Sequence, residues 1–119
     1  MDRVCVVLPV LRGRTTDARA FMEELERHRQ VEYAASERRL GISRELWYLA
    51  HVAETDLLVG YLEAADFAAA ARAFGASSDP FDVWFKRRMI EATGVDLANL
   101  PPGFQPAELL SHYEATAAV

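Results

Sequence analysis

The apolar stretch VCVVLPVL, from Val4 to Leu11, constrains the fold more than any other part of this sequence. Its β-branched residues predict a strand, and because successive side chains of a strand point to opposite faces, both faces of this strand are apolar. A strand of this kind needs a cover on each side. Pro9 cannot donate a backbone hydrogen bond, which favours a sheet edge or a bulge there. We therefore expect a sheet with helices on one face and a second cover on the other.

Helical periodicity after this strand predicts one long helix from about Thr16 to Arg39, ended by Gly41. A hairpin and two helices follow, and after them either a last helical turn or, the interpretation we prefer, a last short strand. Gly60, inside the hairpin, indicates a bulge or the close approach of another group. The predicted bounds are Ile42–Val52 and Asp56–Glu63 for the hairpin strands, Ala65–Phe74 and Pro80 to about Ala92 for the helices, and about Leu109–Tyr113 for the last strand.

This order, β-α-β-β-α-(α)-β, predicts a single α+β domain over residues 1–119. It is the ferredoxin-like plan, an antiparallel sheet with helices on one face. The hairpin places either Trp47 and Leu49 or Tyr48 on the face that the helices leave open. Since an uncovered apolar sheet face implies a partner, and the simplest partner is a second copy related by a two-fold axis, we expect a homodimer.

Charge and cysteine content narrow the classes of function. The net charge of −5 argues against a nucleic-acid partner, because phosphate binding needs a basic face. The single cysteine, Cys5, forms no internal disulfide, which fits a reducing cytoplasm. No run approaches the roughly 20 apolar residues of a membrane span, and the N-terminus does not resemble a signal peptide. His28 and His112 lack partners at metal spacing, and no phosphate loop is present, so we predict no metal and no cofactor.

The chain resembles the dimeric α/β barrel superfamily in its β-α-β-β-α order and its doubly apolar first strand. Within that superfamily it is similar to a small bacterial family of unknown function, over most of residues 3–96. The segments that carry the likeness are LPVLRGRTTDARAFMEELERHR, GISRELWYLAHVAETDLLVGYLEAADF and SSDPFDVWFKRRM. In the third segment Asp79 and Phe85 stand where that family has histidines, whereas Asp82 matches.

This resemblance implies a homodimer with a cavity between the sheet and the helices or the second subunit. The superfamily includes cofactor-independent monooxygenases and cyclases of polyketide pathways, along with decarboxylases, dehydratases and ligand-binding regulator domains. A role in antibiotic biosynthesis or other secondary metabolism is therefore among its implications. The fold does not choose between these reactions.

Three residues are candidates for acid–base catalysis. Glu45 shares a strand face with His51, so that burial would raise the pKa of Glu45 and make it a base, with His51 as a proton shuttle. The alternative is that this face is exposed near the end of the hairpin. Asp82 lies in the first turn of a helix capped by Asp79, where it either stabilises the helix start or faces a pocket.

Five further residues are candidates for substrate binding. Aromatic side chains suit the wall of an apolar pocket, and a large one also suits a dimer interface. Lys86 begins a basic triplet that is either a solvated surface or a site for a carboxylate or phenolate. The candidates are Trp47, Tyr48, Tyr61, Trp84 and Lys86.

Two functions remain open from the sequence. The first is a small-molecule-binding enzyme without a cofactor, of cyclase, isomerase, dehydratase or monooxygenase type, acting on an apolar aromatic or polyketide-like substrate. The second is a non-catalytic ligand-binding or structural dimer. The polar groups of the first hairpin strand favour the first function, and the lack of an unmistakable catalytic pair favours the second.

Overall fold

The structure, a computed structural model, describes residues 1–116. These residues form an α+β fold in the order β-α-α-β-β-α-α. The strands are β1 (Asp2–Pro9), β2 (Ile42–Val52) and β3 (Thr55–Ala64), and the helices are α1 (Thr15–His28), α2 (Gln30–Leu40), α3 (Phe67–Ala76) and α4 (Pro80–Thr93). None of the described helices has the length and apolar character needed to cross a bilayer.

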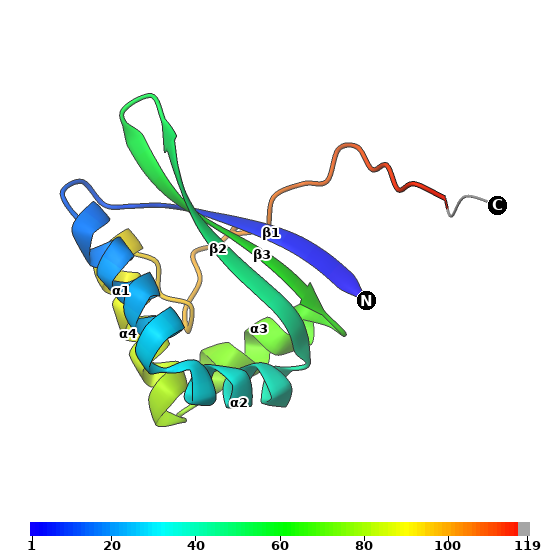
Figure 1. Cartoon of the computed structure of the whole chain (residues 1–119), viewed down its shortest axis with the longest axis horizontal. Coiled ribbons are helices and arrows are strands. Elements are labelled where there is room, and N and C mark those ends of the chain that lie inside the picture. The colour runs from blue at the N-terminus through cyan, green and yellow to red at the C-terminus, as the bar shows by residue number, and fades with distance from the viewer. Residues whose placement is uncertain (117–119) are drawn as a thin grey trace.

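The strands form one antiparallel sheet in the order β1-β3-β2, and the helices gather on one of its faces (Figure 1). In the register of this sheet Val6 and Trp47 both pair with Gly60. These side chains point toward the helices, where they meet a core that includes the fully buried Phe21 and Met89. The predicted hairpin and α+β class are thus confirmed.

Of the two alternatives predicted at Gly60, the close approach is the one confirmed. A Cβ placed on Gly60 would lie 2.7 Å from the ring of Trp47. That distance is shorter than carbon–carbon contact allows, so only glycine leaves room for the indole across the centre of the sheet.

The predicted long helix is in fact two helices. The chain turns at Arg29, which has φ −126° and ψ 24°, and α1 and α2 run in different directions (Figure 1). The guanidinium of Arg29 bonds to Glu24 at 2.9 Å and lies 4.3 Å from the centre of the Trp84 ring. The polar and aromatic contacts of Arg29 therefore hold the turn, which places α2 under the sheet.

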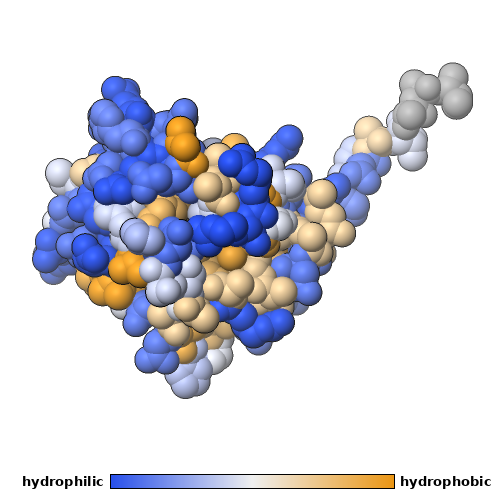
Figure 2. Space-filling view, turned by 90° about the horizontal axis from the view of Figure 1, so that it is seen from below, coloured by the Kyte–Doolittle hydropathy of each residue, from blue (hydrophilic) through white to orange (hydrophobic). Residues whose placement is uncertain are grey.

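The prediction of a fourth strand around Leu109–Tyr113 was wrong. Residues 105–116, the last that the structure describes, have no regular secondary structure and extend away from the body (Figures 1 and 2). Ala107 N donates to Cys5 O of β1 at 2.7 Å, but Leu109, Leu110 and Tyr113 are 77–87% exposed. Pro106 just before Ala107 has no N–H to donate to a strand ladder, and no second layer covers these side chains.

The sheet face away from the helices is apolar, and within residues 1–116 no helix covers it. Val7, Val59 and Tyr48 form one row across the three strands, with Val7 41% and Tyr48 58% exposed. Cys5, Tyr61 and Leu46 form the next row. Within this chain β1 is therefore buried on one side only.

Candidate functional site

A cavity of about 310 Å³ lies between the helix-facing side of the sheet and helices α2, α3 and α4. Residues 97–106, after α4, supply a further part of its wall. The wall is mostly apolar; among its members are Leu8, Leu62, Phe67, Phe74, Phe85 and Phe104. By contrast, the surface seen from the side of α2 and α3 is largely hydrophilic with scattered apolar patches (Figure 2). The cavity therefore suits an apolar small molecule.

Glu45 brings a carboxylate into this apolar wall. Its position on β2 puts it on the helix-facing side, two residues from Trp47. Glu45 Oε2 accepts hydrogen bonds from Tyr33 Oη at 2.5 Å and from Trp47 Nε1 at 2.8 Å. Burial and the neighbouring Glu45 raise the pKa of Tyr33 far above its usual value, so Tyr33 remains a donor. The carboxylate is thus held in one orientation, and neither of these hydrogen bonds reaches Glu45 Oε1.

Glu37, on α2, is a second carboxyl group in the same wall. Burial, and then the charge and hydrogen bonding of Glu45, raise the pKa of Glu37 to about 10. Glu37 Oε2 is buried and finds no hydrogen-bond donor among the described residues. Glu37 therefore keeps its proton at neutral pH.

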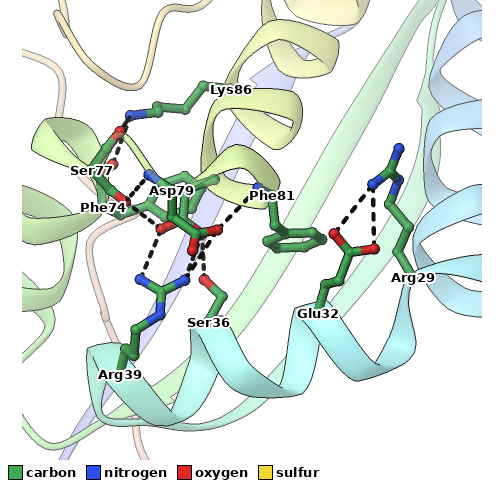
Figure 3. A network of polar contacts seen from close by, with 10 residues as sticks. Arg29, Glu32, Ser36, Arg39, Phe74, Ser77, Asp79, Phe81 and Lys86 are labelled. Carbon is green, nitrogen blue, oxygen red and sulfur yellow. Dashed lines mark hydrogen bonds and ion pairs between the residues drawn. The ribbon is translucent and has the colours of Figure 1, made fainter.

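Asp82 is fully buried but does not line the cavity. It accepts hydrogen bonds from Ser36 Oγ and Ser77 Oγ, each at 2.6 Å, and from Arg39 Nη1 at 3.1 Å (Figure 3). Burial opposes ionisation, but the bonds from Arg39 and the two serines outweigh it and keep the pKa of Asp82 below its usual value. Asp82 thus joins α2, the α3–α4 turn and the start of α4.

Lys86, which the sequence suggested as a binding group for a substrate anion, is buried, and all its hydrogen-bond donors are in use. Its Nζ donates to the backbone carbonyls of Phe74 at 2.9 Å, Gly75 at 3.0 Å and Ser77 at 2.8 Å. Figure 3 shows Lys86 beside Phe74 and Ser77. An ammonium group has three N–H donors, so these carbonyls at the end of α3 occupy it. Lys86 holds α4 against α3 and does not line the cavity.

His51 lies at the far end of the hairpin, exposed, in contact with Asp56. Asp56 in turn accepts a hydrogen bond from Thr15 at the start of α1. This hydrogen bond is the main reason why the pKa of Asp56 is lowered. The structure therefore does not bring His51 to Glu45. The strand alternation placed both on one face, but β2 extends beyond the helices before it reaches His51.

The remaining aromatic candidates also lie outside the cavity. Tyr48 and Tyr61 point to the open sheet face, where Tyr61 Oη donates to Glu63 at 2.7 Å. Trp84 packs edge-on against Phe21, with ring centres 5.4 Å apart. Of the predicted site residues, Glu45 and Trp47 are the two that meet at the cavity.

Tyr33 and Glu37 were missed by the sequence reasoning. They lie four residues apart on α2, and Leu40 follows on the same side, so a helical stripe of Tyr, Glu and Leu marks the cavity wall. The stripe is recognisable only if α2 is treated as a helix of its own, because the turn at Arg29 changes which residues face inward.

Comparison of the chain with models of protein families, with curated proteins and with solved structures gave no match. Among residues 1–116, no group of three or more His, Cys, Asp or Glu side chains is placed to hold a metal ion. The cavity and its polar groups are therefore the basis for assigning a function.

Proposed function

We propose that this chain is a small-molecule-binding protein of the dimeric α/β barrel type, whose cavity holds an apolar aromatic or polyketide-like molecule. We further propose that Glu45 carries out cofactor-independent acid–base chemistry there, of cyclase, isomerase or dehydratase type. The observation that carries this proposal is a carboxylate, oriented by Tyr33 and Trp47, in the wall of a largely apolar cavity of about 310 Å³. The cytoplasmic location and a role in secondary metabolism are part of the proposal and rest on the sequence.

The chemistry follows from the surroundings of Glu45. Because Tyr33 and Trp47 fix the orientation of its carboxylate, the cost of aligning this base with a bound substrate is removed. Glu45 would take a proton from a carbon next to a carbonyl group, while the electron pair of that C–H bond moves onto the carbonyl oxygen as an enolate. Where a C=C bond lies beyond that carbon, the enolate is conjugated, and return of the same proton to the far end of that bond isomerises the substrate with no net gain or loss of atoms.

A second copy of the chain completes the proposed protein. Support comes from the apolar rows of the open sheet face and from Leu109, Leu110 and Tyr113, whose side chains nothing within residues 1–116 covers. Burying such surface stabilises association by roughly 25 cal/mol per Å² before the costs of association are counted. Because the face is a single patch on each subunit, it suits a two-fold interface.

A non-catalytic ligand-binding dimer is the second candidate. One observation favours it: His51 and Asp82, the other proposed acid–base residues, lie outside the cavity, held by Asp56 and by Arg39 respectively. In that case the Glu37–Glu45 pair serves recognition alone. Proton transfer at a bound molecule separates the two candidates.

Ligand binding is tested by filling the cavity. Ala70 is buried on α3 and lines the cavity, whereas Ala73, on the same helix, is exposed and does not. We expect the neutral fluorescent probe N-phenyl-1-naphthylamine to bind the unaltered chain and the Ala73→Leu variant alike. Ala70→Leu should weaken binding by about tenfold or more, because the added carbons occupy the ligand's space. Equal binding by both variants would place the probe elsewhere.

A further inference from the structure

The wall of the cavity carries carboxyl groups and no cation. Glu37 and Glu45 line it, and none of the lining residues is Lys, Arg or His. The ion pairs found within residues 1–116 include neither glutamate. A carboxylate in an apolar wall without a cationic partner is costly, so this arrangement is incomplete on its own.

The cations nearby are already engaged. Arg39, two residues after Glu37 on α2, turns to Asp82 and Asp79 at 3.1 Å and 3.5 Å. Arg29, at the other end of α2, pairs with Glu24 and Glu32 (Figure 3 shows the Glu32 contact). The buried ammonium of Lys86 is held by backbone carbonyls. The chain thus holds several cations around the cavity and directs each of them to another acceptor.

The acceptors of the pair are also incompletely satisfied. Both protein donors to Glu45, from Tyr33 and Trp47, reach Oε2. Glu37 Oε2 is buried and finds no donor among the described residues. Burial and the neighbouring Glu45 raise the pKa of Glu37 to about 10, so without a ligand Glu37 keeps its proton near neutral pH. The group that this arrangement lacks is a positively charged hydrogen-bond donor.

We propose that the molecule bound in this cavity is an apolar amine, with its ammonium group between Glu37 and Glu45 and its hydrocarbon body against the aromatic wall. This inference rests on the proposed ligand-binding function of the cavity and specifies the class of ligand. An ammonium ion supplies three donors, which match Glu37 Oε2 and Glu45 Oε1 and leave one for a further acceptor. The aromatic rings of Tyr33 and Trp47 add cation–π attraction.

Binding of the amine displaces the proton of Glu37. The amine enters as its ammonium form, Glu37 releases its proton to the solvent, and the site then holds two carboxylates and one cation. A neutral ketone accepts a hydrogen bond from protonated Glu37 but provides no donor for the open oxygens. A carboxylate ligand adds a further negative charge to a site without a cation, which costs affinity.

Three probes with one naphthalene body test this inference: 1-(2-naphthyl)ethylamine, the neutral 2-acetylnaphthalene and the anionic 2-naphthoate. In calorimetric titrations of the full chain near neutral pH, we expect the amine to bind at least about tenfold more tightly than the ketone, and naphthoate more weakly than either. Titration in buffers of different ionisation enthalpy should show about one proton released per amine bound.

Variants of the pair show whether these carboxyl groups are the cause. Glu37→Gln keeps the size of the side chain and should remove both the preference for the amine and the proton release, while the ketone binds as before. Glu45→Gln should weaken binding of the amine in the same way. Glu32→Gln is the matched control, because Glu32 is an exposed glutamate on the same helix and outside the cavity. Circular dichroism of each variant verifies that it is folded.

Each outcome decides a different point. Equal affinity for amine and ketone overturns the charge inference and leaves the cavity as a ligand site. An amine preference that persists in Glu37→Gln and Glu45→Gln also overturns it, because the cation then binds elsewhere. If none of the three probes binds, the proposed function itself fails.

Discussion

Trp47 lies across Gly60 in the centre of the sheet, so close that a Cβ on Gly60 would be 2.7 Å from the indole ring. The same indole donates from Nε1 to Glu45 Oε2 at 2.8 Å. A missing side chain on β3 therefore sets the position of a carboxylate on β2. This link between the packing of the sheet and the polar groups of the cavity can be tested by substitution.

Gly60→Ala should destabilise the fold by about 1–3 kcal/mol, because the added methyl displaces the Trp47 ring. It should also change tryptophan fluorescence, measured alongside urea denaturation. In a Trp47→Phe background the contacting atoms Cζ3 and Cη2 are absent, so there Gly60→Ala should cost much less. An equal cost in both backgrounds would mean that the indole is not the group displaced.

Glu37 should make the fold less stable as the pH rises. Burial, then the charge and hydrogen bonding of Glu45 and the charge of Asp82, raise its pKa from 4.5 to about 10 in the folded chain. Between these values the unfolded chain loses the proton and the folded chain keeps it, so the free energy of unfolding falls with pH, by at most about 1.4 kcal/mol per unit.

Glu37→Gln removes that dependence and should be the more stable protein at about pH 8. The measurement is urea denaturation of both proteins across this pH range, in which the stability difference should grow steadily in favour of the variant. Curves that stay parallel would show that Glu37 titrates normally.

Lys86→Met should destabilise the fold by about 2–3 kcal/mol, because three carbonyls at the end of α3 lose a charged donor. Binding of N-phenyl-1-naphthylamine by the folded variant should be unchanged, since Lys86 does not line the cavity. Arg87→Met, at an exposed neighbouring position, is the control and should alter neither property. Loss of binding at full stability would instead support the substrate-binding role that the sequence suggested for Lys86.

The open sheet face should hold two subunits together. Tyr48 is 58% exposed on that face, midway along β2, and a glutamate there would bring a charge into an apolar interface. In light scattering at micromolar concentration we expect a dimer for the unaltered chain and a monomer for Tyr48→Glu. Val83→Glu, at an exposed apolar position of α4, should remain dimeric. A monomeric unaltered chain would refute the proposed interface.

Much of the fold could be predicted because local signals agree with it. Asp66 and Asp79 cap their helices through side-chain bonds to Ala69 N and Phe81 N, and Gly41 ends α2 in the left-handed conformation. The turn at Arg29 has neither glycine nor proline to indicate it, since the side chain of Arg29 holds it through Glu24 and through the Trp84 ring of α4. The fourth strand was predicted from an apolar pattern that lacks a layer to pack against.

Part of the site could also be predicted, because a local signal, the alternation of side chains along a strand, agrees with the structure. Strand alternation correctly grouped Glu45 with Trp47, because a period of two fixes which face a residue occupies. Alternation does not tell how far along the strand the helices reach, so it could not show that His51 lies outside the cavity. Tyr33 and Glu37 depend on the rotation of α2, which only the tertiary structure determines.

The central claim is that Glu45 transfers protons inside the cavity, and hydrogen–deuterium exchange at 2-tetralone tests it most directly. In D₂O, followed by NMR, the unaltered chain should accelerate exchange at the carbon next to the carbonyl, and Glu45→Gln should reduce that acceleration by about a hundredfold while it remains folded. Exchange that is as fast with Glu45→Gln as with the unaltered chain would contradict the account.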